Sequence, residues 1–167
     1  MANDTDAQRA YMLVHQAKRL NLPALFVTNN DATKFPNLKL GADCEENFKF
    51  DRILCDVPCS GDGTLRKNPL LWKTFHAHLG HSLHALQRDI LIRGLSMLKK
   101  GGRMTYSTCS FNPIENEAVV QAALLHFKGK IQLVKPKVSE HLKSRPGMLR
   151  WKVYHKKKST YHPAEWY

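Results

Sequence analysis

Long apolar runs and a leader segment are what this sequence most plainly lacks. No stretch of about 18 consecutive apolar residues occurs, so no segment is long enough to cross a bilayer as a helix. The first six residues carry neither the basic block nor the apolar block of a secretory signal peptide. We therefore expect a protein that spans no membrane and stays in a reducing compartment, where its four cysteines remain free thiols.

Metal-binding patterns and repeats are also missing. The four cysteines form no Cys-x-x-Cys pair and the nine histidines are scattered along the chain, which argues against a zinc site. No internal repeat or low-complexity tract occurs, and 167 residues are enough for one domain. We therefore predict one domain without a bound metal ion.

Acidic residues are scarce relative to basic ones. The chain has 26 Lys and Arg against 14 Asp and Glu, a formal net charge of +12. Such a charge favours a polyanionic partner such as nucleic acid, although membrane surfaces also attract basic proteins.

Short apolar runs alternate with helical patterns along the chain. The predicted elements are a strand that ends before Asp4, a helix capped by Thr5 that ends before residue 21, a buried strand at 24–28, a buried strand at 53–57, a helix from Ser82 with a leucine-rich stripe that Gly101 and Gly102 end, a strand at 104–107, a helix from Asn112 to about residue 127, and a strand at 131–134. This alternation predicts an α/β fold with a parallel sheet and right-handed crossovers.

The alternation fades after Pro136. We assign residues 1–136 to the α/β domain and residues 137–167 to a basic C-terminal segment of undefined order. We interpret the basic part of that segment as a solvated or frayed end, with a surface that faces nucleic acid as the alternative.

Two predicted strands end in small polar turns that each carry a cysteine, Cys59 and Cys109. Ligands of open α/β sheets bind outside the carboxyl ends of the strands, and Cys109 also precedes a helix start, which favours a thiolate. The pair is a candidate nucleophile and helper, and spacing alone leaves open which of the two attacks. The alternative for a lone cysteine is a small packed residue. Cys55 lies inside a strand and should be packed, and Cys44 lies in a loop without evident chemistry.

Three aspartates stand at the ends of successive predicted strands, namely Asp4, Asp31 and Asp56. Acids at such positions often bind ribose hydroxyls or a base edge, so the three together favour a site for a nucleoside cofactor. Each of them alone could equally cap a turn or a helix. The Gly-rich first turn of such sites is absent, because Gly61 and Gly63 come too late in the order of elements.

Two long motifs surround the paired cysteines. The first is Asp56-Val57-Pro58-Cys59-Ser60-Gly61, followed by Gly63-Thr64 and Arg66-Lys67-Asn68-Pro69. The second is Gly101-Gly102-Arg103, then Tyr106-Ser107-Thr108-Cys109-Ser110 and Asn112-Pro113-Ile114-Glu115-Asn116-Glu117. Together they resemble the RNA cytosine-5 methyltransferases of the Sun family. The opening Ala2-Asn3-Asp4 and the later His15-Gln16-Ala17-Lys18-Arg19-Leu20 are similar to the eukaryotic tRNA branch of that family.

The resemblance implies a class I methyltransferase Rossmann-like fold, S-adenosyl-L-methionine as the cofactor, and RNA, tRNA in particular, as the partner. It implies Asp4 at the ribose, Asp31 near the adenine and Asp56 beside the reacting end of the cofactor. It also implies Cys109 as the nucleophile that attacks carbon 6 of cytosine and Cys59 as the thiol that assists product release. We expect a monomer in the nucleus or nucleolus, with the cytoplasm as the alternative.

Departures from the family pattern shape the remaining expectations. The Gly-rich cofactor loop and the central first strand are not found before Asp4, and the final strands are also missing. We therefore expect an incomplete sheet, interrupted between the strands that end near Asp4 and Asp56, and weak or no cofactor binding by this chain alone. Arg66 and Lys67 are candidates for contacts with RNA phosphates, with an ordinary exposed basic turn as the alternative.

Three functions stay open at this point. The first is methylation of cytosine carbon 5 in RNA through a covalent adduct between a cysteine and carbon 6. The alternative is a catalytically inactive basic fragment that binds RNA. A third and weaker interpretation is a thiol redox module, which predicts a disulfide between Cys59 and Cys109.

Overall fold

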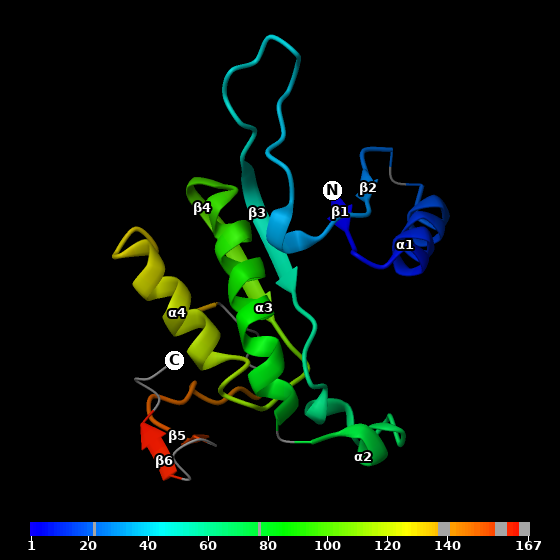
Figure 1. Ribbon diagram of the computed structural model, residues 1–167. Helices are drawn as coiled ribbons and strands as arrows, with labels where there is room; N and C mark the ends of the chain where they lie inside the picture. The colour runs from blue at the N-terminus through cyan, green and yellow to red at the C-terminus, as the bar shows by residue number, and fades with distance from the viewer. Residues whose placement is uncertain (22, 77, 137–140, 156–159, 164–167) are drawn as a thin grey trace. The chain divides into compact units, whose positions relative to one another are not determined.

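The computed structural model describes residues 1–21, 23–76, 78–136, 141–155 and 160–163 (Figure 1). The chain divides into two compact units, one of residues 1–54 with 93–105 and the other of residues 55–92 with 106–167. The elements in chain order are β1 (Ala2–Asn3), α1 (Ala7–Arg19), β2 (Val27–Thr28), η1 (Ala32–Lys34), β3 (Phe50–Asp56), η2 (Asp62–Thr64), α2 (Leu71–Thr74), α3 (His78–Ser96), β4 (Leu98–Ser107), α4 (Glu117–Phe127), β5 (Lys152–His155) and β6 (Thr160–Pro163). Their alternation confirms the predicted α/β class.

Strands pair only in twos within the described part of the chain: β1 with β2, β3 with β4, and β5 with β6. β1 and β2 run parallel, with Ala2 opposite Val27 and Asn3 opposite Thr28, and α1 connects them as predicted. The expected interruption of the sheet is confirmed, because β1 and β3 belong to separate sheets.

Helix α1 of the first unit begins at a different cap from the one predicted. Asp6, rather than Thr5, is the N-cap, and its carboxylate accepts a hydrogen bond from the Arg9 amide at 2.9 Å. Both residue types cap helices well, but the extended backbone that a cap needs falls at Asp6. The predicted end before residue 21 is confirmed, since the helix ends at Arg19.

Helix α3 and strand β4 differ from the prediction at their boundaries. The helix begins before Ser82, whose hydroxyl donates to the Leu79 carbonyl at 2.8 Å from inside the helix instead of capping it. It ends at Ser96, so the prediction that Gly101 and Gly102 end it is wrong. Both glycines lie within β4, and Gly101 has a φ of 78°, which glycine adopts without strain.

The buried stripe of α3 carries polar side chains that the predicted leucine stripe does not include. Its buried residues are Gly80, His84, Gln87 and Leu91, three or four positions apart. Leu86 of the predicted stripe is instead exposed. This polar stripe faces residues near the cysteine turns, because Gln87 donates to a carbonyl there and His84 contacts the backbone that follows the second turn.

Helix α4 starts later than predicted. Asn112 caps a turn instead, since its side-chain oxygen accepts from the Ile114 amide at 3.1 Å and its carbonyl accepts from the Glu115 amide at 3.0 Å. The helix then runs from Glu117 to Phe127, which confirms the predicted end. The predicted strand at 131–134 is wrong, because those residues adopt no regular structure and no described strand pairs with them.

Two predicted strands are less buried than expected. Phe26, directly before β2, is 69% exposed, and Leu54 of β3 is 74% exposed. Since each of these strands has a single partner, one edge and part of its faces are left uncovered.

The C-terminal basic segment contains an antiparallel pair. β5 and β6 pair with His155 opposite Thr160, and residues 156–159 between them lie outside the described residues. Part of the segment is therefore strand instead of frayed end, whereas the division into 1–136 and 137–167 stays a prediction. Among the described residues, no helix combines the length and apolarity needed to cross a membrane.

Candidate active site

Two thiols meet in the second unit. Cys59 lies in the turn after β3 and Cys109 in the turn after β4, and their sulfur atoms are 3.2 Å apart. The Cys109 amide also donates to the Cys59 sulfur at 3.3 Å. Cys109 is exposed and Cys59 is half-buried, so the thiols differ in access although they touch. The structure brings the predicted pair together, and their separate roles stay predictions.

Two hydrogen bonds hold the two cysteine turns against each other. The Gly63 amide donates to the Cys109 carbonyl at 2.9 Å, and the Phe111 amide donates to the Asp62 carboxylate at 3.0 Å. Gly61 takes a φ of 76°, a left-handed conformation that favours glycine and redirects the chain after the first turn. The turn glycines therefore allow the close approach that places the thiols side by side.

The surroundings of Cys59 keep its thiol protonated. Burial, followed by the hydrogen bond with Cys109, raises the pKa of Cys59 from 9.0 to about 11. Cys55 behaves similarly, since burial and then the charge of Asp56 raise its pKa to about 11, and it is packed inside β3 as predicted. At neutral pH both groups are neutral thiols, which are poor nucleophiles.

A buried carboxylate, that of Glu115, lies next to the thiols; the sequence interpretation counted this residue in the second motif but gave it no role in the site. Its side chain is 0% exposed and accepts hydrogen bonds from Ser60, Ser110 and Gln87. The oxygen of the Gln87 side-chain amide, Oε1, is buried without a hydrogen-bond partner among the described residues. The signal in the sequence was a serine directly after each cysteine, Ser60 and Ser110, together with the polar Gln87 in the leucine-rich helix.

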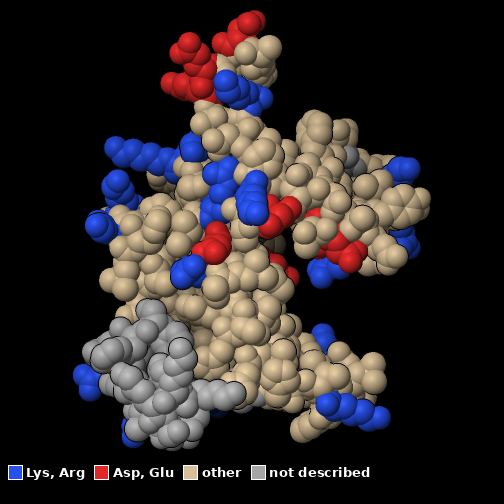
Figure 2. Space-filling view, in the orientation of Figure 1, with Lys and Arg blue, Asp and Glu red and all other residues tan. Residues whose placement is uncertain are grey.

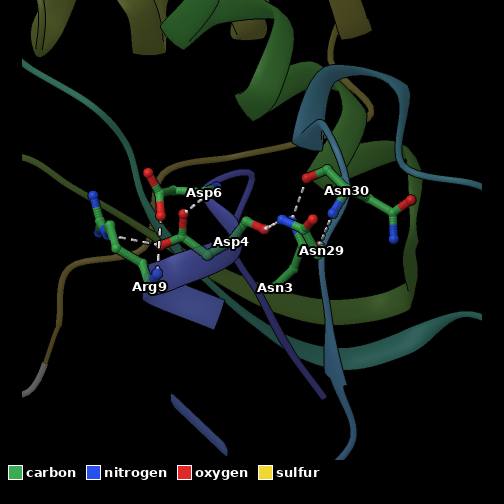
Figure 3. Close-up of polar contacts among 6 residues, drawn as sticks. All are labelled: Asn3, Asp4, Asp6, Arg9, Asn29 and Asn30. Atoms are coloured by element: carbon green, nitrogen blue, oxygen red, sulfur yellow. Dashed lines mark hydrogen bonds and ion pairs between the residues drawn. The ribbon is translucent and has the colours of Figure 1, made fainter. Parts of the chain in front are cut away.

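Asp4 and Asp31 lie in the first unit, each just beyond a short strand. The Asp4 carboxylate pairs with the Arg9 guanidinium at 3.0 Å and accepts from the Asp6 amide at 2.9 Å (Figure 3). Asp31 caps η1, and hydrogen bonds from the side chain and the backbone of Thr33 lower the pKa of its carboxyl group. Asp31 thus acts as a cap and Asp4 as an ion-pair partner and turn acceptor, and an oxygen that accepts one hydrogen bond can still accept a second.

Asparagine side chains tie the ends of β1 and β2 together. Asn3 donates to the Asn30 carbonyl at 2.9 Å, and Asn29 donates to the Asp4 carbonyl at 2.8 Å, as Figure 3 shows. The Asn3 side-chain oxygen accepts from the Thr28 hydroxyl at 2.9 Å. These contacts fix the backbone on which Asp4 sits.

Asp56 belongs to the second unit. It ends β3, is exposed, and accepts a hydrogen bond from the Ser107 hydroxyl at 3.0 Å. Asp56 lies three residues before Cys59, and its strand, β3, pairs with β4, the strand that precedes Cys109. A single site shared by Asp4, Asp31 and Asp56 stays a prediction.

Arg66 and Lys67 lie on an exposed turn that follows η2, in the same unit as the thiols. Lysine and arginine side chains project from many parts of the surface on the face shown in Figure 2.

The described residues contain no group of three or more His, Cys, Asp or Glu side chains that could hold a metal ion.

Solved structures define the class of the fold. A methyltransferase homologue from Pyrococcus horikoshii superposes with a TM-score of 0.59 at 32% identity, over 75% of this chain and 36% of that one. NSun6 from Pyrococcus horikoshii, in a structure with SFG, gives a TM-score of 0.67 at 28% identity, over 82% of this chain and 32% of that one. The fold is thus the α/β fold of these methyltransferases, and the short sheets are consistent with an incomplete Rossmann-like domain.

The family model for 16S rRNA methyltransferase RsmB/F matches residues 1–164. The chain belongs to this family, and the resemblance to the Sun family is confirmed.

Curated relatives are similar over most of this chain. A tRNA (cytosine(34)-C(5))-methyltransferase of Drosophila melanogaster is 53% identical over 156 residues, which cover 92% of this chain and 21% of the relative. A multisite-specific tRNA:(cytosine-C(5))-methyltransferase of Saccharomyces cerevisiae is 53% identical over 159 residues, 92% of this chain and 23% of the relative. The chain therefore spans less than a quarter of the length of these two relatives.

Proposed function

We propose that the protein containing this chain methylates carbon 5 of cytosine in RNA, with tRNA as the substrate class. The observation that carries the proposal is the contact between the exposed Cys109 and the half-buried Cys59, at 3.2 Å between sulfur atoms. A covalent methyl transfer to carbon 5 needs a nucleophile that adds to carbon 6 and later leaves, and the pair offers one thiol for that role and a second beside it to assist the departure.

The asymmetry of the pair supports Cys109 as the nucleophile. Cys109 is open to a substrate, whereas burial raises the pKa of Cys59 to about 11 and keeps it as a neutral thiol. An attacking sulfur must be reachable and must form a thiolate, and a neutral thiol is suited to donate a proton instead.

In the proposed reaction Cys109 forms and later breaks a bond to cytosine, and Cys59 lies beside it. The Cys109 thiolate forms a bond to carbon 6 of cytosine, and the electron pair of the 5,6 double bond moves to carbon 5. That pair forms the bond to the methyl group, whose bond to its donor breaks with the electrons left on the donor. A base then removes the proton of carbon 5, the double bond forms again and Cys109 leaves as a thiolate. Cys59 lies 3.2 Å from the departing sulfur, close enough to donate a hydrogen bond to it.

S-Adenosyl-L-methionine would supply the electrophilic methyl group. NSun6, a neighbour in fold, was solved with SFG, an analogue of that cofactor. The three carboxylates suit a nucleoside, since Asp4, Asp31 and Asp56 lie at or just beyond strand ends and can accept hydrogen bonds from hydroxyl groups. We assign Asp4 to the ribose, Asp31 to the adenine and Asp56 to the reacting end.

The charge of the chain supports an RNA partner. A net charge of +12 attracts phosphates, and Arg66 and Lys67 present exposed cations in the unit that holds the thiols. The names of the two relatives described above specify tRNA as their substrate. A catalytically inactive RNA-binding role is not favoured, because those relatives are enzymes.

Trapping with RNA that contains 5-azacytosine tests the proposal. The protein containing this sequence should form an adduct that survives denaturing electrophoresis, and Cys109→Ala should abolish it. Cys59→Ala should accumulate the adduct with ordinary cytosine RNA, because release of the product is slowed.

Cys44→Ala is the matched control, since Cys44 is also an exposed free cysteine but lies in a loop of the other unit. This variant should trap RNA like the unmodified protein. An adduct that persists in Cys109→Ala would overturn the assignment of the nucleophile, and no adduct in the unmodified protein would overturn the proposed reaction.

A further inference from the structure

The carboxylate of Glu115 is fully buried and accepts four hydrogen bonds. Its Oε2 accepts from the Ser60 amide at 2.8 Å and from the Gln87 side-chain amide at 3.0 Å. Its Oε1 accepts from the Ser110 hydroxyl at 2.9 Å and from the Ser60 hydroxyl. All four donors are neutral, so hydrogen bonds alone compensate the loss of water around this group.

The donors come from the two cysteine turns and from α3. Ser60 directly follows Cys59, Ser110 directly follows Cys109, and the two serine hydroxyls lie 3.2 Å apart. Gln87 extends the connection, because its amide also donates to the carbonyl of Pro58, the residue before Cys59. One carboxylate therefore links the backbone on both sides of the first thiol to the backbone after the second.

We propose that Glu115 is a positioning residue for the thiol pair, and that it holds the Cys59 and Cys109 sulfur atoms in contact by joining Ser60 to Ser110. The role of the pair in catalysis rests on the function proposed above, whereas the positioning itself does not.

A glutamine at this position would have nearly the same shape but no charge and only one acceptor oxygen. Each oxygen of Glu115 faces two donors, and an amide replaces one oxygen by an NH₂ group that can only donate. The Ser60 and Ser110 hydroxyls can turn to accept from that group, so Glu115→Gln leaves no cavity but replaces charge-assisted hydrogen bonds by weaker neutral ones. The expected result is a weaker link between the two turns while the rest of the unit stays folded.

Thiol–disulfide exchange measures the spacing of the sulfur atoms without RNA or cofactor. Two thiols and one molecule of oxidised glutathione give one protein disulfide and two molecules of reduced glutathione, so the equilibrium reports the effective concentration of Cys59 against Cys109. A loss of alignment lowers such an effective concentration steeply, and we expect a decrease of about tenfold or more in Glu115→Gln.

Glu117→Gln is the matched control. Glu117 lies two residues further along the same segment and accepts from the Met148 amide at 2.8 Å. Its substitution should leave the thiol equilibrium unchanged. Ser110→Ala removes a single donor to Glu115 and should give a smaller decrease, which keeps the proposal testable if Glu115→Gln does not fold.

The rate of adduct trapping on 5-azacytosine RNA connects the positioning to the reaction. Glu115→Gln should slow trapping while the affinity for RNA is unchanged, because the substitution is buried. An unchanged thiol equilibrium in both Glu115→Gln and Ser110→Ala would overturn the positioning role. A shifted equilibrium in a protein that traps no RNA would support positioning and contradict the methyltransferase function instead.

Discussion

Replacing Gly63 by alanine tests how tightly the two cysteine turns are packed against each other. A Cβ atom at this position would lie 2.7 Å from the Cys109 carbonyl oxygen and 3.3 Å from its carbonyl carbon. Because ordinary contact begins near 3.4 Å, the Cys109 turn must retreat by about 0.7 Å, and overpacking of this kind costs about 1–3 kcal/mol. The same movement strains the 2.9 Å hydrogen bond from the Gly63 amide to the Cys109 carbonyl.

Thermal unfolding and thiol chemistry measure the two consequences. For a domain of this size, the cost corresponds to a decrease in Tm of about 2–12 °C. The displacement of Cys109 should also lower the rate at which a disulfide to Cys59 forms under mild oxidation. Both effects should appear in the same variant, because they have a single structural cause.

Gly41→Ala is the control for this experiment. An added Cβ at Gly41 meets no atom within 4 Å, and alanine reduces the freedom of the unfolded chain, so the Tm should be unchanged or slightly higher. Equal Tm values and equal disulfide rates for Gly63→Ala and the unmodified chain would refute the packing argument.

Two further predictions follow from the surroundings of single groups. Since the pKa of Cys59 is raised from 9.0 to about 11, the folded state favours the neutral thiol; the stability it contributes is present below pH 9 and is lost as the pH rises toward 11. Site-resolved alkylation should show the rate at Cys59 still increasing above pH 10 in the folded protein but levelling off earlier in denaturant, and coincident profiles would contradict the raised pKa. Asp6→Ala should reduce the free energy of unfolding by about 0.5–2 kcal/mol through loss of the α1 cap, whereas Thr5→Ala should change it by less than about 0.5 kcal/mol in urea titrations. The reverse ranking would restore Thr5 as the cap.

Local patterns predicted the parts of the fold that depend on a few neighbouring residues. The α/β alternation, the end of α1, the end of α4 and the packed position of Cys55 follow from apolar spacing and helix stop signals within one element. Helix starts were less reliable, because several polar residues near each start can cap and the backbone conformation selects one of them. Ser82 illustrates this, since its hydroxyl bonds a carbonyl inside α3.

Burial could not be predicted in the same way. An apolar run such as the one that contains Phe26 is buried only where other strands or helices cover it, and here β2 has a single partner. The polar stripe of α3 shows the opposite case, since hydrogen bonds to the carbonyls of Ile114 and Pro58 offset the cost of burying His84 and Gln87.

The sequence by itself determined the class of fold, the family and the two turns that carry Cys59 and Cys109, because these are written in contiguous motifs. Only the tertiary structure decided that the two sulfur atoms touch, that Cys59 is the less accessible of the pair, and that Glu115 joins their turns. The reason is physical: residues 50 or more positions apart come within hydrogen-bond distance through the pairing of β3 with β4 and the packing of α3, which no local pattern specifies.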